Sequence, residues 1–198
     1  MEQFISPEKF QELMSLEGET RGIGFKTEAQ FIEEKQGEEA REKFEKAMAD
    51  LGLPYSDIKA LNFYPLGWLG VALVVMSNLF GFKEKDFEEM GKFEAKSSLV
   101  IKLFMKYFVS LERVKKEAGR MWREYYTVGT LEVPELNQEE KHIMIQVNDF
   151  KLHPFLCHVL QGYFVSIVKM IVNSEVESTE QECVHQGGRH HLFLIKWK

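Results

Sequence analysis

Residues 180–198 read Glu-Gln-Glu-Cys-Val-His-Gln-Gly-Gly-Arg-His-His-Leu-Phe-Leu-Ile-Lys-Trp-Lys. A Gly-Gly pair between two segments of strand-forming residues predicts a β-hairpin. We expect residues 186–188 to form a three-residue loop, because such a loop favours glycine at its third position. In that register Cys183 and His191 pair directly, with their side chains on one face of the sheet.

The segments before this hairpin extend the predicted sheet. Residues 127–133 and 141–147 predict two strands joined by a polar turn over 134–140, and in the second strand polar and apolar residues alternate with a period of two. A long apolar helix should follow from Pro154 to about Asn173. The two strands of the final hairpin are then expected at about 176–185 and 189–198.

The first 126 residues predict helices. Charged and apolar residues alternate there at three-to-four spacing, and residues 58–65 interrupt the helices as a loop. We therefore predict an α+β fold, in which a helical N-terminal half packs on a small antiparallel sheet formed mainly by the C-terminal half. Residues 1–20 are expected to be a helical appendage and residues 21–198 a single domain. The predicted helices cover 7–16, 25–35, 38–51, 67–80, 83–91, 93–110 and 112–126.

Charge and composition exclude several classes of protein. The net charge is −6, whereas binding to nucleic acid draws on clustered lysine and arginine. The longest apolar run, residues 66–82, is interrupted by Ser77 and Asn78 and is shorter than the roughly 20 residues that span a bilayer. With two cysteines and no leader-like start, the chain is expected to be cytoplasmic and to have neither a nucleic-acid partner nor a membrane span.

Three residues could form part of a metal site. Cys157 lies in the first turn of the helix that begins at Pro154, where the helix dipole favours a thiolate. Together with Cys183 and His191 it would supply three ligands. The fourth could be Glu180, His185 or His158, although strict alternation places Glu180 on the opposite face from Cys183. The alternative is a buried cysteine and surface histidines that come together by chance.

The sequence contains no catalytic motif that we recognise. It has no Gly-x-Ser-x-Gly elbow, no His-Glu-x-x-His helix and no Walker loop. Cys157 and His158 are neighbours on a helix and point about 100° apart, so they cannot act as a nucleophile and its base. We therefore expect a protein that is not an enzyme.

The C-terminal half resembles the 4-vinyl reductase domain superfamily of small-molecule sensors, which is related in fold to heme-nitric-oxide-binding domains and to small subunits of the transport protein particle. The matching residues are His153-Pro154-Phe-Leu-Cys157-x4-Gly162 and Glu180-x2-Cys183-x3-Gly187-x3-His191-x-Phe193-x-Ile195-x-Trp197. The N-terminal half is similar to the opening of heme-nitric-oxide-binding domains through Arg21-Gly22-x3-Lys26-x4-Phe31 and Arg41.

The resemblance implies a zinc site formed by Cys157, Glu180, Cys183 and His191, with the histidine where the family has a cysteine. It also implies a sensory or regulatory domain, of the kind found in bacterial signalling, that binds a small apolar or aromatic molecule. We expect the pocket between the helices at 93–110 and 154–173 and the sheet, and the side chains predicted to line it are Phe104, Phe108, Trp122 and Tyr163.

Heme is not expected, because the Tyr-x-Ser-x-Arg motif of the heme-binding relatives is missing and residues 99–126 contain no histidine. Ligand binding would act through a homodimer or a regulatory partner protein. The alternative is a dimerisation or scaffold protein of the transport-particle type that binds no ligand.

Overall fold

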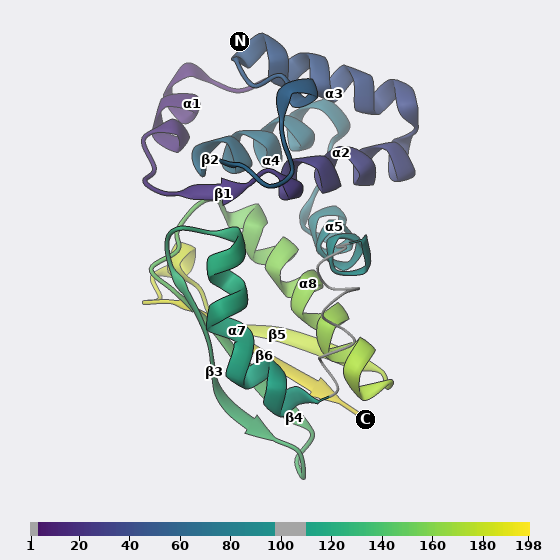
Figure 1. The fold of residues 1–198 in the computed structure, drawn as a ribbon, viewed down its shortest axis with the longest axis vertical. Coiled ribbons are helices and arrows are strands. Elements are labelled where there is room, and N and C mark those ends of the chain that lie inside the picture. Colours follow the sequence, from purple (N-terminus) through teal and green to yellow (C-terminus); the bar gives the residue numbers. More distant parts are fainter. Residues whose placement is uncertain (1–3, 98–109) are drawn as a thin grey trace.

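The computed structural model describes residues 4–97 and 110–198. Its elements lie in two groups, with the first four helices at one end and the larger sheet at the other (Figure 1). In chain order the described elements are α1 (Pro7–Met14), β1 (Glu19–Arg21), α2 (Ile23–Gln36), α3 (Glu38–Leu51), the 3₁₀ helix η1 (Tyr55–Asp57), β2 (Phe63–Pro65), α4 (Gly67–Phe80), α5 (Glu84–Ser97), α7 (Leu111–Tyr125), β3 (Thr130–Asn137), β4 (His142–Asn148), α8 (Pro154–Val172), β5 (Val176–Glu182), the 3₁₀ helix η2 (Val184–Gln186) and β6 (His191–Trp197).

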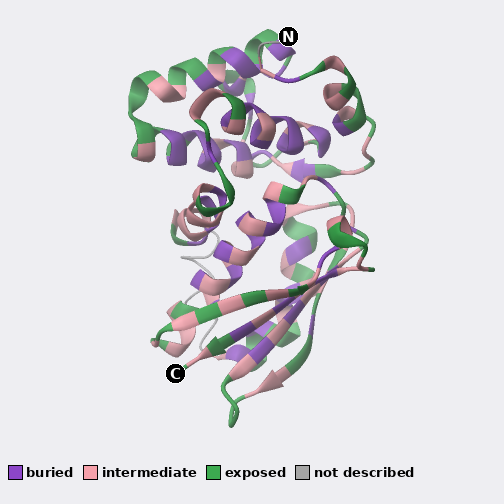
Figure 2. Ribbon diagram, turned by 180° about the vertical axis from the view of Figure 1, so that it is seen from behind, coloured by how far each residue is buried: buried purple, intermediate pink, exposed green. Residues whose placement is uncertain are grey.

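The larger sheet is antiparallel, with the strand order β3-β4-β6-β5. Helices α7 and α8 cover one of its faces (Figure 1). The predicted α+β class is therefore confirmed. A protein sheet with one covered face should bury every second side chain, and β4 does so: Ile143, Ile145 and Val147 are buried, and the residues between them are half-buried (Figure 2).

The predicted turn over residues 134–140 is wrong in its first half. Strand β3 continues to Asn137, and a bulge lies between Glu132 and Glu135. Pro134 falls within this irregularity, on a strand at the edge of the sheet. Proline has no N–H to donate and is tolerated at bulges and on edge strands, so it does not end the strand here.

The helical half follows the predictions closely. The side chain of Ser6 accepts a hydrogen bond from the backbone N–H of Lys9 and begins α1, and α4 has the predicted bounds. Strand β2 lies within the predicted loop over residues 58–65, and it pairs with β1 in a separate two-stranded sheet. Three-residue strands are too short to show a period in the sequence.

Helix α5 differs from the prediction because it is continuous through Gly91, where we expected a break between two helices. The predicted helix over 93–110 falls largely outside the described residues.

Helix α8 is the central element of the domain. Its 19 residues are long and apolar enough to cross a membrane by length and composition alone, but half of its most apolar window is buried within the fold. Helix α5 packs along it, and β5 and β6 lie beneath it. These contacts are those of a core helix in a folded domain.

Candidate ligand pocket and cysteine-histidine cluster

A cavity of about 140 Å³ lies between helices α2, α5, α7 and α8 and the inner face of the sheet. Most of its lining is apolar or aromatic, with contributions from all of these elements. Leu156, Val159 and Leu160 of α8 form one wall, and Val133 and Ile145 of the sheet contribute to the lining. The core therefore contains space that the described side chains do not fill.

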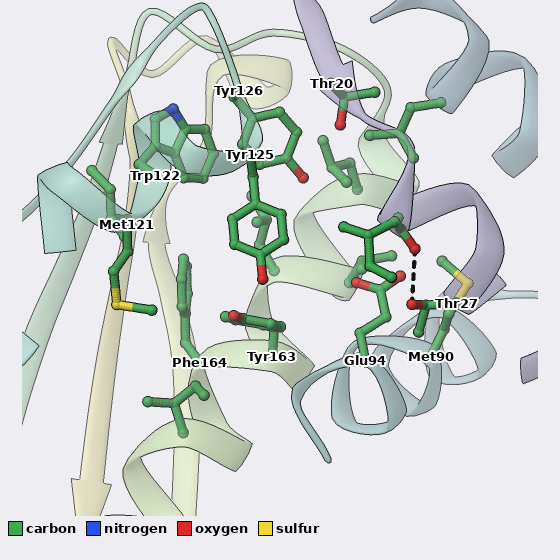
Figure 3. A pocket seen from close by; sticks show the side chains of 18 of the residues that line it. Thr20, Thr27, Met90, Glu94, Met121, Trp122, Tyr125, Tyr126, Tyr163 and Phe164 are labelled. Carbon is green, nitrogen blue, oxygen red and sulfur yellow. Dashed lines mark hydrogen bonds between the residues drawn. The ribbon is translucent and has the colours of Figure 1, made fainter. Parts of the chain in front are cut away.

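Aromatic side chains form the wall on the α7 side. The Trp122 ring lies 4.4 Å from the Tyr126 ring and 4.8 Å, edge to face, from the Phe150 ring, measured between centroids. The Trp122 Nε1–H donates a 2.9 Å hydrogen bond to the Val128 carbonyl, which holds the indole in place. The hydroxyl groups of Tyr125, Tyr126 and Tyr163 point into the same space (Figure 3).

Two carboxylic acids lie in this apolar lining. Glu28 of α2 is completely buried, and its Oε2 accepts a 2.9 Å hydrogen bond from the Tyr55 hydroxyl. Its Oε1 is buried without a hydrogen-bond partner. Burial raises the pKa of Glu28 to about 8. Burial, together with the charge of Glu28, raises the pKa of Glu94 on α5 to about 8 as well.

Of the residues predicted to line a pocket, Trp122 and Tyr163 lie in the lining of this cavity. Phe104 and Phe108 lie outside the described residues. The sequence interpretation missed the two acids. A signal for Glu28 exists, because it lies between Phe25 and Ile32 on the apolar stripe of its helix, where a charged residue is unexpected.

The four predicted metal ligands come together at the start of α8. The ligand atoms of Cys157, Glu180, Cys183 and His191 all lie within 4.8 Å of one another. The Cys157 Sγ lies 3.7 Å from the Cys183 Sγ and 3.6 Å from the His191 Nδ1. Both cysteines and the histidine are buried. His158 and His185, the alternative fourth ligands, are not part of this group.

The predicted three-residue loop of the hairpin is wrong, although its ligands do meet and Glu182 pairs with Leu192 as the predicted register requires. The chain turns through η2, Gly187 takes a positive φ of 88°, and the Gly188 N–H donates to the Cys183 carbonyl, so Cys183 is not paired with His191. A register shift between Glu180 and Glu182 breaks the alternation of β5. This irregularity allows Glu180 to join the cluster, which strict alternation would prevent.

The orientation of the His191 ring follows from its neighbours. The ring Nε2 lies 3.0 Å from the Phe150 carbonyl, which can only accept a hydrogen bond, so the hydrogen is on Nε2. The ring Nδ1 then faces the Cys157 Sγ and the Glu180 Oε1, which lies at 3.1 Å. Burial is the main cause of the raised pKa of both cysteine thiols, and the charge of Glu180 adds to it for each.

Comparison with known proteins gives a clear match only at the level of structure. No protein-family model and no curated protein matches this sequence. An H-NOX protein from S. oneidensis in the Fe(II) ligation state, a triple mutant, is similar with a TM-score of 0.69 and 12% identity, covering 90% of this chain and 96% of that chain. An unliganded Fe(II) H-NOX protein from K. algicida, a point mutant, has a TM-score of 0.67 and 14% identity over 90% and 96%.

A third similar structure, described as concerning heme redox potential and porphyrin distortion, has a TM-score of 0.66 and 14% identity over 90% and 95%. The descriptions of these proteins name iron(II) or heme. The prediction of zinc as the cofactor is therefore wrong, because the comparisons point to heme rather than zinc. The cysteine-histidine cluster remains a group of possible ligands.

The described lining of the cavity does not fit heme. The described lining of the cavity contains no histidine or cysteine to bind the iron and no lysine or arginine to pair with the propionates. Tyrosine can serve as a heme ligand, but burial raises the pKa of Tyr126 and Tyr163 well above the usual range and disfavours the phenolate. Glu28 and Glu94 offer the propionates no positive charge and would repel them when ionised.

The similarity covers nine-tenths of this chain and nearly all of the compared ones, at identities of 12–14%. Likeness of this kind concerns architecture, and it confirms the heme-nitric-oxide-binding part of the predicted resemblance. The 4-vinyl reductase and transport-particle parts stay predictions. The chain therefore has the fold of the heme-nitric-oxide-binding domains.

Proposed function

We propose that this protein is a sensory or regulatory domain that binds a small apolar or aromatic molecule, without heme, in the cavity between α2, α5, α7, α8 and the sheet. The observation that carries the proposal is the cavity itself, which has apolar and aromatic walls and a volume of about 140 Å³. An engineered apolar cavity of about 150 Å³ stays dry and binds benzene. A ligand with a single aromatic ring matches this space.

The position of the cavity suits a sensor. It is bounded by helices from both halves of the chain, so a bound molecule would contact α2 and α5 on one side and α7 and α8 on the other. Ligand binding would stabilise one arrangement of these helices over others, as any ligand that binds one conformation preferentially does. We propose that a homodimer or a partner protein reads this change.

We also propose that Cys157, Glu180, Cys183 and His191 bind a metal ion in a structural role. The support is their mutual distance, the burial of the two cysteines and the histidine, and the position of the His191 ring, whose Nδ1 faces the cluster and whose Nε2–H is held by a backbone carbonyl in the way that orients many metal-binding histidines. A bound metal ion would link the start of α8 to the β5–β6 connection and so stabilise the position of the α8 wall of the cavity. The donor set alone does not select the metal.

The ligand proposal is tested with ethylbenzene, an uncharged molecule with one aromatic ring. A ligand that binds the folded state alone raises the melting temperature in proportion to the logarithm of its concentration. We expect such a rise for the wild-type protein and its loss in Ala118→Phe, which puts a ring into the cavity from a buried position of α7. Lys115→Phe, at an exposed position of the same helix, is the matched control and should keep the rise.

Heme binding is tested separately by an absorption spectrum of protein produced in cells that are supplied with a heme precursor. We expect no Soret band. A stoichiometric Soret band would overturn the heme-free proposal, and an absent thermal shift with ethylbenzene would overturn the apolar pocket.

A further inference from the structure

We propose that the molecule bound in this cavity carries a basic amine on its apolar or aromatic body, and that Glu28 and Glu94 bind the ammonium group. This inference rests on the proposed ligand-binding function and specifies the chemical class of the ligand. It follows from the two carboxyl groups in the cavity and from the absence of cations among its described lining residues.

The Oε1 atom of Glu28 is the first evidence. It is buried without a hydrogen-bond partner, and Tyr55 satisfies only the other oxygen of the carboxyl group. A buried polar atom without a partner costs free energy, so proteins satisfy nearly all such atoms. Because Glu28 lines the cavity, a bound molecule with an N–H donor can supply the missing hydrogen bond.

Glu94 is the second evidence. It reaches the same cavity from α5, on the opposite side from α7, and its carboxyl group points toward the tyrosine hydroxyls (Figure 3). The two acids come from different helices and are close enough for the charge of one to affect the other. Among the described lining residues, no lysine, arginine or histidine is present to neutralise them.

The rest of the lining matches the body of such a ligand. Trp122, Tyr126 and Tyr163 place aromatic rings around the cavity, and aromatic faces attract cations as well as packing against apolar groups. An ammonium group brings a positive charge and up to three N–H donors, whereas an alcohol brings one donor and no charge. A carboxylate brings no N–H donor for the Oε1 of Glu28, and either acid would repel it once ionised.

The protonation of the acids gives the proposal a pH signature. The raised pKa values of Glu28 and Glu94 mean that the empty cavity holds carboxyl protons near neutral pH. To pair with an ammonium group, an acid must first release its proton. Among the described residues, the groups that face the two acids are Tyr55, Tyr125, Tyr126 and Tyr163, and burial raises the pKa of Tyr55, Tyr126 and Tyr163 further above neutrality. Affinity for an amine should therefore rise from pH 6 to pH 8.

The test compares three probes of nearly equal size by isothermal titration calorimetry: 2-phenylethylamine, 2-phenylethanol and 3-phenylpropanoate. At pH 7.5 we expect the amine to bind about tenfold more tightly than the alcohol, as a charge-assisted hydrogen bond would provide, and the carboxylate to bind most weakly. Only the amine should gain affinity between pH 6 and pH 8. In buffers of different ionisation enthalpy, its binding should release protons.

Neutral variants identify the responsible groups. Glu28→Gln and Glu94→Gln keep the side-chain shape and should each weaken amine binding about tenfold. They should leave the binding of 2-phenylethanol within about twofold, which also shows that the variant cavity is intact. Glu132→Gln, at an exposed position of β3 between two lining residues, makes the same charge change outside the cavity and should alter nothing.

Equal or tighter binding of the alcohol or the carboxylate would overturn the amine proposal. So would an amine preference that survives in both glutamine variants. If either of these results were found while ethylbenzene still bound, the amine proposal would be wrong and the proposed apolar pocket would still be supported. If neither ethylbenzene nor any of the three probes binds, both the pocket proposal and the amine proposal are wrong.

Discussion

Gly91 of α5 lies directly against the backbone of Val159 in α8. A β-carbon at Gly91 would lie 1.9 Å from the Val159 carbonyl oxygen, and a β-carbon at Gly162 would lie 2.0 Å from the carbonyl oxygen of Glu88. The two helices are thus in backbone contact at two reciprocal points. Since Glu94 and Tyr163 extend from these helices into the cavity, the glycines determine the distance between two of its walls.

We expect Gly162→Ala to lower the free energy of unfolding by roughly 2–4 kcal/mol, because the methyl group cannot fit without separating the helices. Chemical denaturation would measure this loss. Gly24→Ala is the matched control: it also lies in a helix, and a β-carbon there would contact nothing within 4 Å. It should be neutral or stabilising by up to about 1 kcal/mol. Equal stability of Gly162→Ala and the wild type would contradict the close contact.

Glu28→Gln should change how stability depends on pH. The pKa of Glu28 is raised to about 8 in the folded protein, above its unfolded value, so the folded state holds the proton more tightly. Stability from this group is present below the unfolded pKa of about 4.5 and is lost as the pH rises toward 8. Glutamine keeps an acceptor for Tyr55 without this loss.

At pH 8 the Glu28→Gln variant should therefore be more stable than the wild type by roughly 1–3 kcal/mol, and at pH 4.5 the two should be nearly equal. Melting temperatures across this range would show the difference. A constant difference at all pH values would mean that the charge of Glu28 is not the cause.

His153 gives the opposite pH dependence. Its Nδ1 accepts a 3.3 Å hydrogen bond from the Phe155 N–H at the start of α8, and burial, with a smaller effect of Lys9, lowers its pKa to about 4. The unfolded state therefore binds the proton more readily between pH 6.5 and pH 4, and stability falls as the pH drops through this window.

His153→Asn keeps a residue that caps helices well and removes the titration. Its stability should fall less than that of the wild type between pH 6.5 and pH 4, as measured by denaturation at several pH values. Parallel curves for the two proteins would exclude His153 as a source of acid sensitivity.

Cys183→Ser tests the proposed metal site. If the four-residue cluster binds a metal ion, the variant should lose metal and melting temperature together, and elemental analysis across the first-row transition metals would measure the metal. His158→Gln is the control, since His158 is next to Cys157 on α8 but outside the cluster. Equal metal content in Cys183→Ser and the wild type would rule out the site.

Local patterns in the sequence predicted most of the secondary structure. The alternation of β4, the proline and serine at the start of α1, and the apolar run of α4 each depend on residues within a few positions of one another, and each element forms as predicted. The short strands β1 and β2 were not predicted, because three residues are too few to show a period. Each strand is stabilised by pairing with a partner over 40 residues away in sequence.

The cysteine-histidine cluster shows how a correct set of residues can follow from a wrong geometry. A three-residue hairpin loop was the simplest way to bring Cys183 and His191 together, but the chain uses η2 and Gly187 instead. The register shift that admits Glu180 depends on hydrogen bonding between β5 and β6, which composition does not reveal.

The sequence by itself determined the α+β class, the order of most elements, and a set of residues that meet at the start of α8, because periodicity, capping and turn chemistry act over short distances along the chain. Only the tertiary structure decided that Glu28 and Glu94, which are more than 60 residues apart in sequence, share one apolar cavity. Burial is a property of the packed domain, so the unpartnered oxygen of Glu28 becomes visible only once α2, α5, α7 and α8 are assembled around it.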